Sequence, residues 1–122
     1  MTFADLFILG LLAHLFADWF LQNDWQAANK VDLRHPAAWV HCALHLACLA
    51  VVWPLAAALA VALSHALIDT RKPLVWWRIL LRQKQWRADQ PAETNAVAVH
   101  VAFWQDQAAH LLVLGFVAAV MS

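Results

Sequence analysis

Residues 54–70 read PLAAALAVALSHALIDT, an apolar stretch that ends in a histidine and an aspartate four residues apart. Proline suits the start of a helix, and small alanines let neighbouring membrane helices approach closely. Side chains four residues apart lie on one helix face, so His65 and Asp69 form a polar stripe on an apolar surface. The stretch therefore predicts an apolar helix with a polar pair near its carboxyl end.

The other apolar stretches carry pairs with the same spacing, namely His14 and Asp18, His41 and His45, and Asp106 and His110. The four stretches cover about residues 3–22, 37–53, 54–70 and 97–121, near the roughly twenty residues that a membrane-spanning helix needs. We therefore predict an all-α fold, a polytopic membrane four-helix bundle in which residues 1–122 form a single membrane domain.

The composition and the charge distribution agree with this prediction. Hydrophobic residues make up 64% of the chain and charged residues 13%, against about 25% charged residues in ordinary soluble domains. All positive charges fall between the first two or the last two stretches, at Lys30, Arg34, Arg71, Lys72, Arg78, Arg82, Lys84 and Arg87. The positive-inside rule places these segments in the cytoplasm and both termini outside. Because topology accounts for every positive charge, we expect no nucleic-acid partner.

The segment at residues 73–87, PLVWWRILLRQKQWR, mixes large apolar side chains with positive ones. It is too charged to span a bilayer and too apolar for a free loop, so we expect an interfacial amphipathic helix on the inner leaflet. Trp76, Trp77 and Trp86 would lie at the level of the headgroups, which makes membrane lipids the first expected partners. Residues 23–36, by contrast, are expected to form a polar cytoplasmic loop, with a short helical turn left open, and His35 within it is expected to be a solvated loop histidine.

The order of the residues within the pairs predicts where they meet. In alternating spans, every aspartate falls nearer the cytoplasm, and its partner histidine lies one turn deeper. We expect one layer formed by Asp18, His41, Asp69 and Asp106, and a second formed by His14, His45, His65 and His110. Such a set of carboxylates and imidazoles on four helices predicts convergence on one polar centre.

A metal site is the expected role of that centre. Each charged side chain in mid-membrane costs roughly 2.5–3.5 kcal/mol, so three buried aspartates need compensation. A divalent transition metal (zinc, manganese or iron, as one or two ions) would provide it, with all eight residues as candidate ligands. Gln22 and Gln107 are expected to hydrogen-bond to ligands rather than to bind the ion. Cys42 and Cys48 are expected to be small packing residues.

Two resemblances come from the motifs HLFADWFLQNDWQAANK (14–30), HCALH (41–45), HALID (65–69) and DQAAH (106–110). Together they resemble a bacterial and phage-borne family of small membrane proteins of unknown function. That resemblance implies the predicted fold and a bacterial inner-membrane location, but no activity. More distantly, the chain resembles inner-membrane proteins described as metal-dependent hydrolases, which suggests hydrolase chemistry by analogy.

These features favour a membrane-embedded metal-dependent hydrolase that acts on a lipid or lipid-linked substrate near the cytoplasmic interface. A metal would polarise a phosphoryl or acyl group, and Asp18 or Asp106 is the expected general base. Three other functions stay open, namely a haem or non-haem redox protein, a transporter of metal ions or protons, and a non-catalytic accessory subunit. Assembly into a homo-oligomer is also open.

Overall fold

The computed structural model describes residues 1–83 and 96–122, and within them the predicted all-α fold is confirmed. The helices are α1 (Phe3–Phe16), the π-helical turn η1 (Ala17–Leu21), α2 (Asp24–Asn29), α3 (Pro36–Val52), α4 (Leu55–Asp69), α5 (Lys72–Leu80) and α6 (Ala96–Met121). The bounds of α3 and α4 fall within one residue of the predicted spans. Only Trp53 and Pro54 separate α3 from α4, and this short connection makes the two helices run antiparallel.

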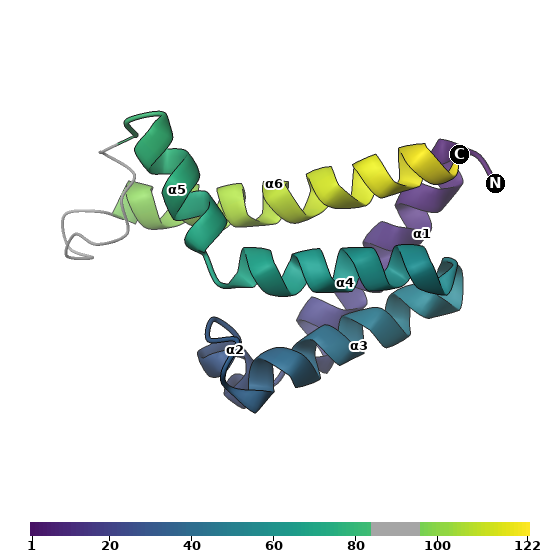
Figure 1. The fold of residues 1–122 in the computed structure, drawn as a ribbon, viewed down its shortest axis with the longest axis horizontal. Helices are drawn as coiled ribbons and strands as arrows, with labels where there is room; N and C mark the ends of the chain where they lie inside the picture. Colours follow the sequence, from purple (N-terminus) through teal and green to yellow (C-terminus); the bar gives the residue numbers. More distant parts are fainter. Residues whose placement is uncertain (84–95) are drawn as a thin grey trace.

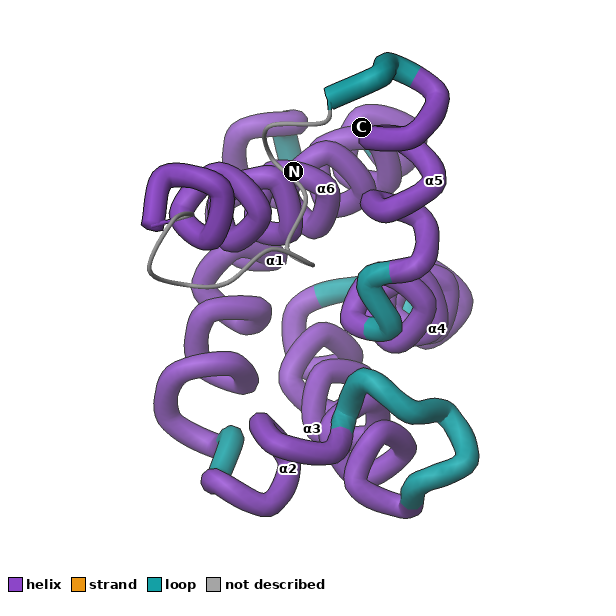
Figure 2. Tube along the Cα trace, turned by 90° about the vertical axis from the view of Figure 1, so that its left-hand side faces the viewer, coloured by secondary structure: helices purple, strands orange, loops and turns teal. Residues whose placement is uncertain are grey.

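The four long helices pack in a closed ring, in which α1 contacts α3 and α6, and α4 contacts the same two helices. Figure 2 shows this ring nearly end-on, with α1 and α4 on opposite sides. Both termini lie at one end of the molecule, and α2 and α5 lie toward the other (Figure 1). The fold therefore has a termini end and an opposite end that carries the two short helices.

The interior of the termini end is apolar. Its core is a cluster of buried residues from α1, α3, α4 and α6 that consists of Leu6, Leu49, Trp53, Ala58, Val61, Leu114 and Ala118. The Trp53 indole donates a hydrogen bond of 3.0 Å to the Leu6 carbonyl. A Cβ atom on Gly10 would lie 2.3 Å from the Trp53 ring, so only glycine lets this ring pack against α1. This core fixes α1 against the α3–α4 hairpin.

The first predicted span is not a uniform α-helix. Its last turn, Ala17–Leu21, is π-helical, and the backbone becomes extended at Gln22. A π turn inserts an extra residue per turn and is frequent at functional sites. The predicted helix over about residues 3–22 is present as Phe3–Leu21, but the turn that holds Asp18 is π-helical rather than α-helical.

The segment predicted as a polar loop contains the helix α2. Its N-cap is Asn23, whose side chain accepts a hydrogen bond of 2.9 Å from the Gln26 backbone. His35, expected to be a solvated loop residue, instead caps α3 by accepting a hydrogen bond from the Ala37 backbone. These caps satisfy backbone groups that helix starts leave without intrahelical partners.

The predicted amphipathic helix at residues 73–87 is shorter in the structure. The helix α5 ends at Leu80 because the chain turns back through Arg82, whose φ is 56°. The Gln83 backbone then donates to the Arg78 carbonyl and the Arg82 backbone to the Ile79 carbonyl, as in a Schellman motif. Residues 84–87 of the predicted helix lie outside the described residues.

Within residues 1–83 and 96–122, two helices are long and apolar enough to cross a membrane. They are Phe3–Leu21, with 19 residues, and His100–Met121, with 22 residues. The helices α3 and α4 are apolar but have only 17 and 15 residues. A membrane bundle of four spans is therefore not confirmed by helix length.

Candidate metal centre

The carboxylate of Asp18 lies at the middle of the predicted site. Its Oδ1 atom is 3.1 Å from Nε2 of His41 and 2.9 Å from Nε2 of His45, both on α3. The same oxygen lies 3.6 Å from Nε2 of His65 on α4, and Oδ2 lies 3.3 Å from Nε2 of His14 on α1. One carboxylate on the π turn thus links histidines from three helices.

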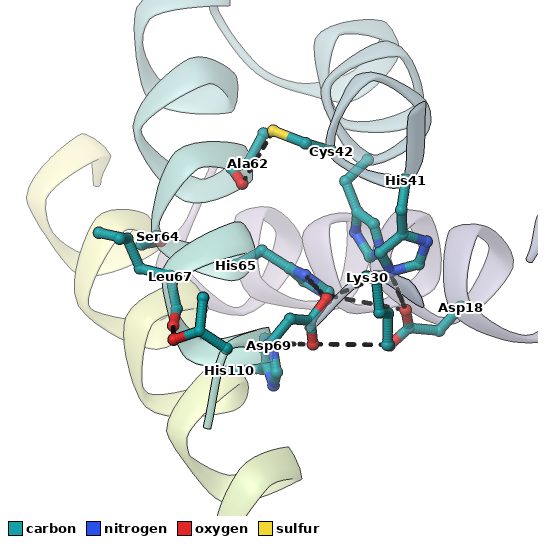
Figure 3. Close-up of polar contacts among 12 residues, drawn as sticks. Asp18, Lys30, His41, Cys42, Ala62, Ser64, His65, Leu67, Asp69 and His110 are labelled. Carbon is teal, nitrogen blue, oxygen red and sulfur yellow. Dashed lines mark hydrogen bonds and ion pairs between the residues drawn. The ribbon is translucent and has the colours of Figure 1, made fainter. Parts of the chain in front are cut away.

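A second carboxylate, that of Asp69, extends the cluster toward α6. Its Oδ2 atom is 3.0 Å from Nδ1 of His65 and 3.5 Å from Nε2 of His41. Its Oδ1 atom is 3.5 Å from Nε2 of His110 on α6. Asp69 and Asp18 thus approach different nitrogens of the His65 ring, and Figure 3 shows both carboxylates near this ring. Imidazoles therefore connect the two carboxylates.

The third carboxylate, that of Asp106, is the least enclosed of the three. It lies 3.7 Å from Nδ1 of His110, and its side chain is 23% exposed, against 3% for the side chain of Asp69. The His110 ring is fixed more firmly by a contact of 2.7 Å between Nδ1 and the Asp106 carbonyl oxygen. Asp106 therefore borders the cluster and remains accessible.

The four histidines of the predicted deeper layer are neighbours in space. The ring centroids of His45 and His65 are 3.7 Å apart, and those of His65 and His110 are 4.0 Å apart. The His14 ring lies between 5.1 and 5.4 Å from each of the other three. The structure thus brings all eight predicted residues into one connected cluster, as their order along the helices requires.

Three sets of ligand atoms within this cluster are close enough to hold an ion. They are His14, Asp18, His45 and His65; His41, His65 and Asp69; and Asp69, Asp106 and His110, with the atoms of each set within 4.8 Å of one another. Two sets share His65 and two share Asp69. Because neighbouring sets share a residue, the cluster has ligand atoms for one ion or for two adjacent ions. Nothing in the geometry identifies the metal.

Several buried ligand atoms also have no hydrogen-bond partner among the described residues. They include Nε2 of His14, Nε2 of His41, Nε2 of His110 and Oδ2 of Asp69. Each of these histidine nitrogens lies near a carboxylate oxygen, and the Asp69 oxygen lies near an imidazole nitrogen. These contacts lack the angles that a hydrogen bond requires. A buried polar atom without a partner costs about 1–3 kcal/mol, which coordination to a cation would offset. The donor set therefore fits a transition metal.

Two residues at the centre were missed by the sequence analysis. Gln26 on α2 is buried, and its Oε1 atom lies 3.2 Å from Nδ1 of His41. Lys30 follows α2, and its Nζ atom lies 3.5 Å from Oδ1 of Asp69. Gln26 and Lys30 are four residues apart, so a short helix places both on one face. This spacing was not recognised because the segment was predicted as a loop.

The remaining predicted residues take minor positions. The Gln107 side chain donates a bond of 3.3 Å to Asp106, which agrees with its predicted role beside a ligand. Gln22 has a buried Oε1 atom without a partner among the described residues. Cys42 is buried and donates to the Ala62 carbonyl, so it packs between α3 and α4, whereas Cys48 is only partly buried.

Comparison with known proteins identifies the family but no activity. The chain belongs to the family described as protein of unknown function (DUF3307), whose sequence model matches residues 6–122. No curated protein and no solved structure matches the chain. The function must therefore be inferred from the site itself.

Proposed function

We propose that this member of a family without an assigned activity is a membrane-embedded metalloprotein of the bacterial inner membrane. In this proposal, one or two divalent transition metal ions (zinc, manganese or iron) bind between the helices. The protein acts as a hydrolase on a lipid or lipid-linked substrate near the cytoplasmic interface. The observation that carries the proposal is the buried cluster of three carboxylates and five imidazoles.

The distribution of polar and apolar side chains supports the membrane location. On α4 the exposed leucines recur every four residues, at Leu55, Leu59, Leu63 and Leu67. The polar residues His65 and Asp69 of the same helix are buried. On α6, Leu112, Phe116 and Val120 are each more than 70% exposed. Ionisable groups inside and leucines outside are the pattern expected of a helix in lipid.

The lengths of α3 and α4 set a condition on this location. At about 1.5 Å per residue, 17 residues of α3 extend about 25 Å, which is shorter than the roughly 30 Å of a typical hydrocarbon core. A short span is accommodated by local thinning of the bilayer. In the proposed topology all four helices cross the membrane, with the termini outside and α2 and α5 on the cytoplasmic side.

The chemistry follows from the differences among the three carboxylates. A bound metal would polarise a phosphoryl or acyl group and make a water molecule more acidic. Asp18 contacts four imidazoles, which leaves it little freedom to exchange protons with a substrate. Asp106 is more exposed and has fewer contacts. The geometry therefore favours Asp106 over Asp18 as the general base.

Two of the alternative functions are less well supported by the same geometry. The ring centroid of His65 lies only 3.7 Å from that of His45 and 4.0 Å from that of His110. These distances leave no space for a porphyrin between the rings, which disfavours a haem protein. Among the described residues, the interior of the termini end is an apolar cluster that includes Leu49 and Leu114. That cluster interrupts a polar path across the bundle and disfavours transport.

The test is to incubate the purified, metal-loaded chain with a panel of phospholipids and lipid-linked phosphates and esters. We expect hydrolysis of one class, and a decrease of about 10²–10⁴-fold in kcat for Asp106→Asn if its carboxylate is the general base. Metal content is measured on the same samples. A wild-type chain that binds a metal stoichiometrically but hydrolyses none of the panel would refute the hydrolase, and one that binds no metal would refute the whole proposal.

A further inference from the structure

A cavity of about 500 Å³ borders the candidate metal centre, a size typical of sites for small ligands. One part of its lining is acidic, because Asp18, Asp69 and Asp106 all contribute to it. These are the three carboxylates of the cluster, so any ligand in the cavity lies next to the proposed metal. The rest of the lining then indicates which ligand fits.

Positive side chains form a second part of the lining. They are Lys30, Arg71 and Arg78. Lys30 is near Asp69, and Arg78 is buried, with its Nε atom donating to the Leu74 carbonyl at 3.2 Å. No carboxylate among the described residues forms an ion pair with Arg71. A cavity that needed only to admit water or a neutral ester would not require these cations.

The backbone holds Arg71 at a defined place on the cavity. Arg71 follows the last turn of α4 and adopts a left-handed conformation, with φ of 63°. Its backbone N–H donates to the Ile68 carbonyl at 2.8 Å, which closes the end of the helix. Asp69 is two residues earlier on the same helix end. The backbone of Arg71 is therefore fixed at the end of the helix that supplies a central carboxylate of the cluster.

Apolar side chains complete the lining, and they include Trp19, Val31, Leu74 and Phe103. Trp19 and Phe103 are also exposed at the molecular surface. A ligand in this cavity therefore meets carboxylates, cations and an apolar wall that continues outward. A lipid with a charged headgroup matches this lining, because its headgroup fits the charged part and its acyl chains fit the apolar wall.

We propose that the cavity binds the phosphoryl group of a phosphate ester, with its oxygens between the metal centre and the cations Lys30 and Arg71. Guanidinium and ammonium groups are the side chains that recognise phosphate, and a carboxylate-bound metal offers a second positive contact. The inference rests on the proposed function and narrows its substrate class, because a carboxylic ester is neutral and gains nothing from these cations. The phosphoryl group belongs either to a lipid headgroup or to free phosphate.

The test is calorimetric titration of the full chain in detergent micelles, with heats from protein-free micelles subtracted. The probes are dihexanoyl phosphatidic acid, inorganic phosphate and uncharged dihexanoylglycerol. The variant is Arg71→Gln, and the matched control is Arg82→Gln, because Arg82 also has a positive φ and is exposed but does not line the cavity. Metal content is measured for each protein.

We expect Arg71→Gln to weaken binding of phosphatidic acid about tenfold with unchanged metal content, and Arg82→Gln to change it less than about twofold. Tighter binding of phosphatidic acid than of inorganic phosphate supports a lipid source, and equal binding supports free phosphate. Equal binding of dihexanoylglycerol and phosphatidic acid, or equal effects of the two variants, overturns the inference. A chain without metal that still binds phosphate through Arg71 supports the anion cavity and refutes the proposed metal-dependent function.

Discussion

Replacement of Asp69 by asparagine perturbs the proposed metal centre with the smallest change in shape. Asp69 belongs to two of the three candidate ligand sets and is only 4% exposed. Its oxygens lie 3.0 Å from His65 and 3.5 Å from His110. Asparagine keeps the volume and one carbonyl oxygen, but it removes the negative charge that a metal ion would neutralise.

The expected magnitude follows from the place of Asp69 in the cluster. Loss of a group that only orients a ligand lowers metal affinity about 10–100-fold. Asp69 is a candidate direct ligand, so Asp69→Asn should weaken binding by at least about 100-fold, or about 2.8 kcal/mol at about 1.4 kcal/mol per tenfold. If two ions bind and share Asp69, the stoichiometry should also decrease.

The assay is mass-spectrometric metal analysis of the detergent-purified chain after equilibration over a series of buffered free-metal concentrations. Asp24→Asn is the matched control, because Asp24 is exposed in the first turn of α2 and belongs to none of the ligand sets. Circular dichroism verifies that both variants are helical. Equal metal affinity of the wild type and Asp69→Asn would refute the assignment of Asp69 as a ligand.

Two further variants test the packing and the support of the centre. Gly10→Ala places a Cβ atom 2.3 Å from the Trp53 ring and should destabilise the fold by about 1–3 kcal/mol, whereas Gly115→Ala, whose Cβ would meet nothing closer than 3.7 Å, should be nearly neutral in the same thermal unfolding experiment. Similar melting temperatures for both would contradict this packing. Gln26→Leu removes the oxygen 3.2 Å from His41 Nδ1 and should lower metal affinity about 10–100-fold without abolishing binding at saturating metal. Unchanged affinity would show that Gln26 does not support the ligand.

The positions of the long helices could be predicted from sequence because hydropathy and helix period are local properties. Residues 54–70 predicted a helix with His65 and Asp69 on one face, and the structure has α4 at Leu55–Asp69 with both side chains buried. The ends of short helices were less predictable. The helix α5 ends at Leu80 because Arg82 adopts a left-handed conformation. Arginine has no preference for this conformation, so the sequence did not predict the end of the helix.

The sequence by itself determined which helix faces are polar, and the order of histidine and aspartate along each helix indicated that these faces meet. That information is local, because residues four apart share a face wherever the helix lies. Whether the cluster binds a metal stays a prediction.

Only the tertiary structure decided which groups touch. It places Asp18 on a π turn among four imidazoles, and it returns Gln26 and Lys30 from α2 to the centre. These contacts depend on how α2 packs against α3 after the extended backbone at Gln22. They also depend on the direction that the chain takes at Arg71, after the end of α4. Small changes in backbone direction at such junctions move side chains by several ångströms, and no local sequence period encodes them.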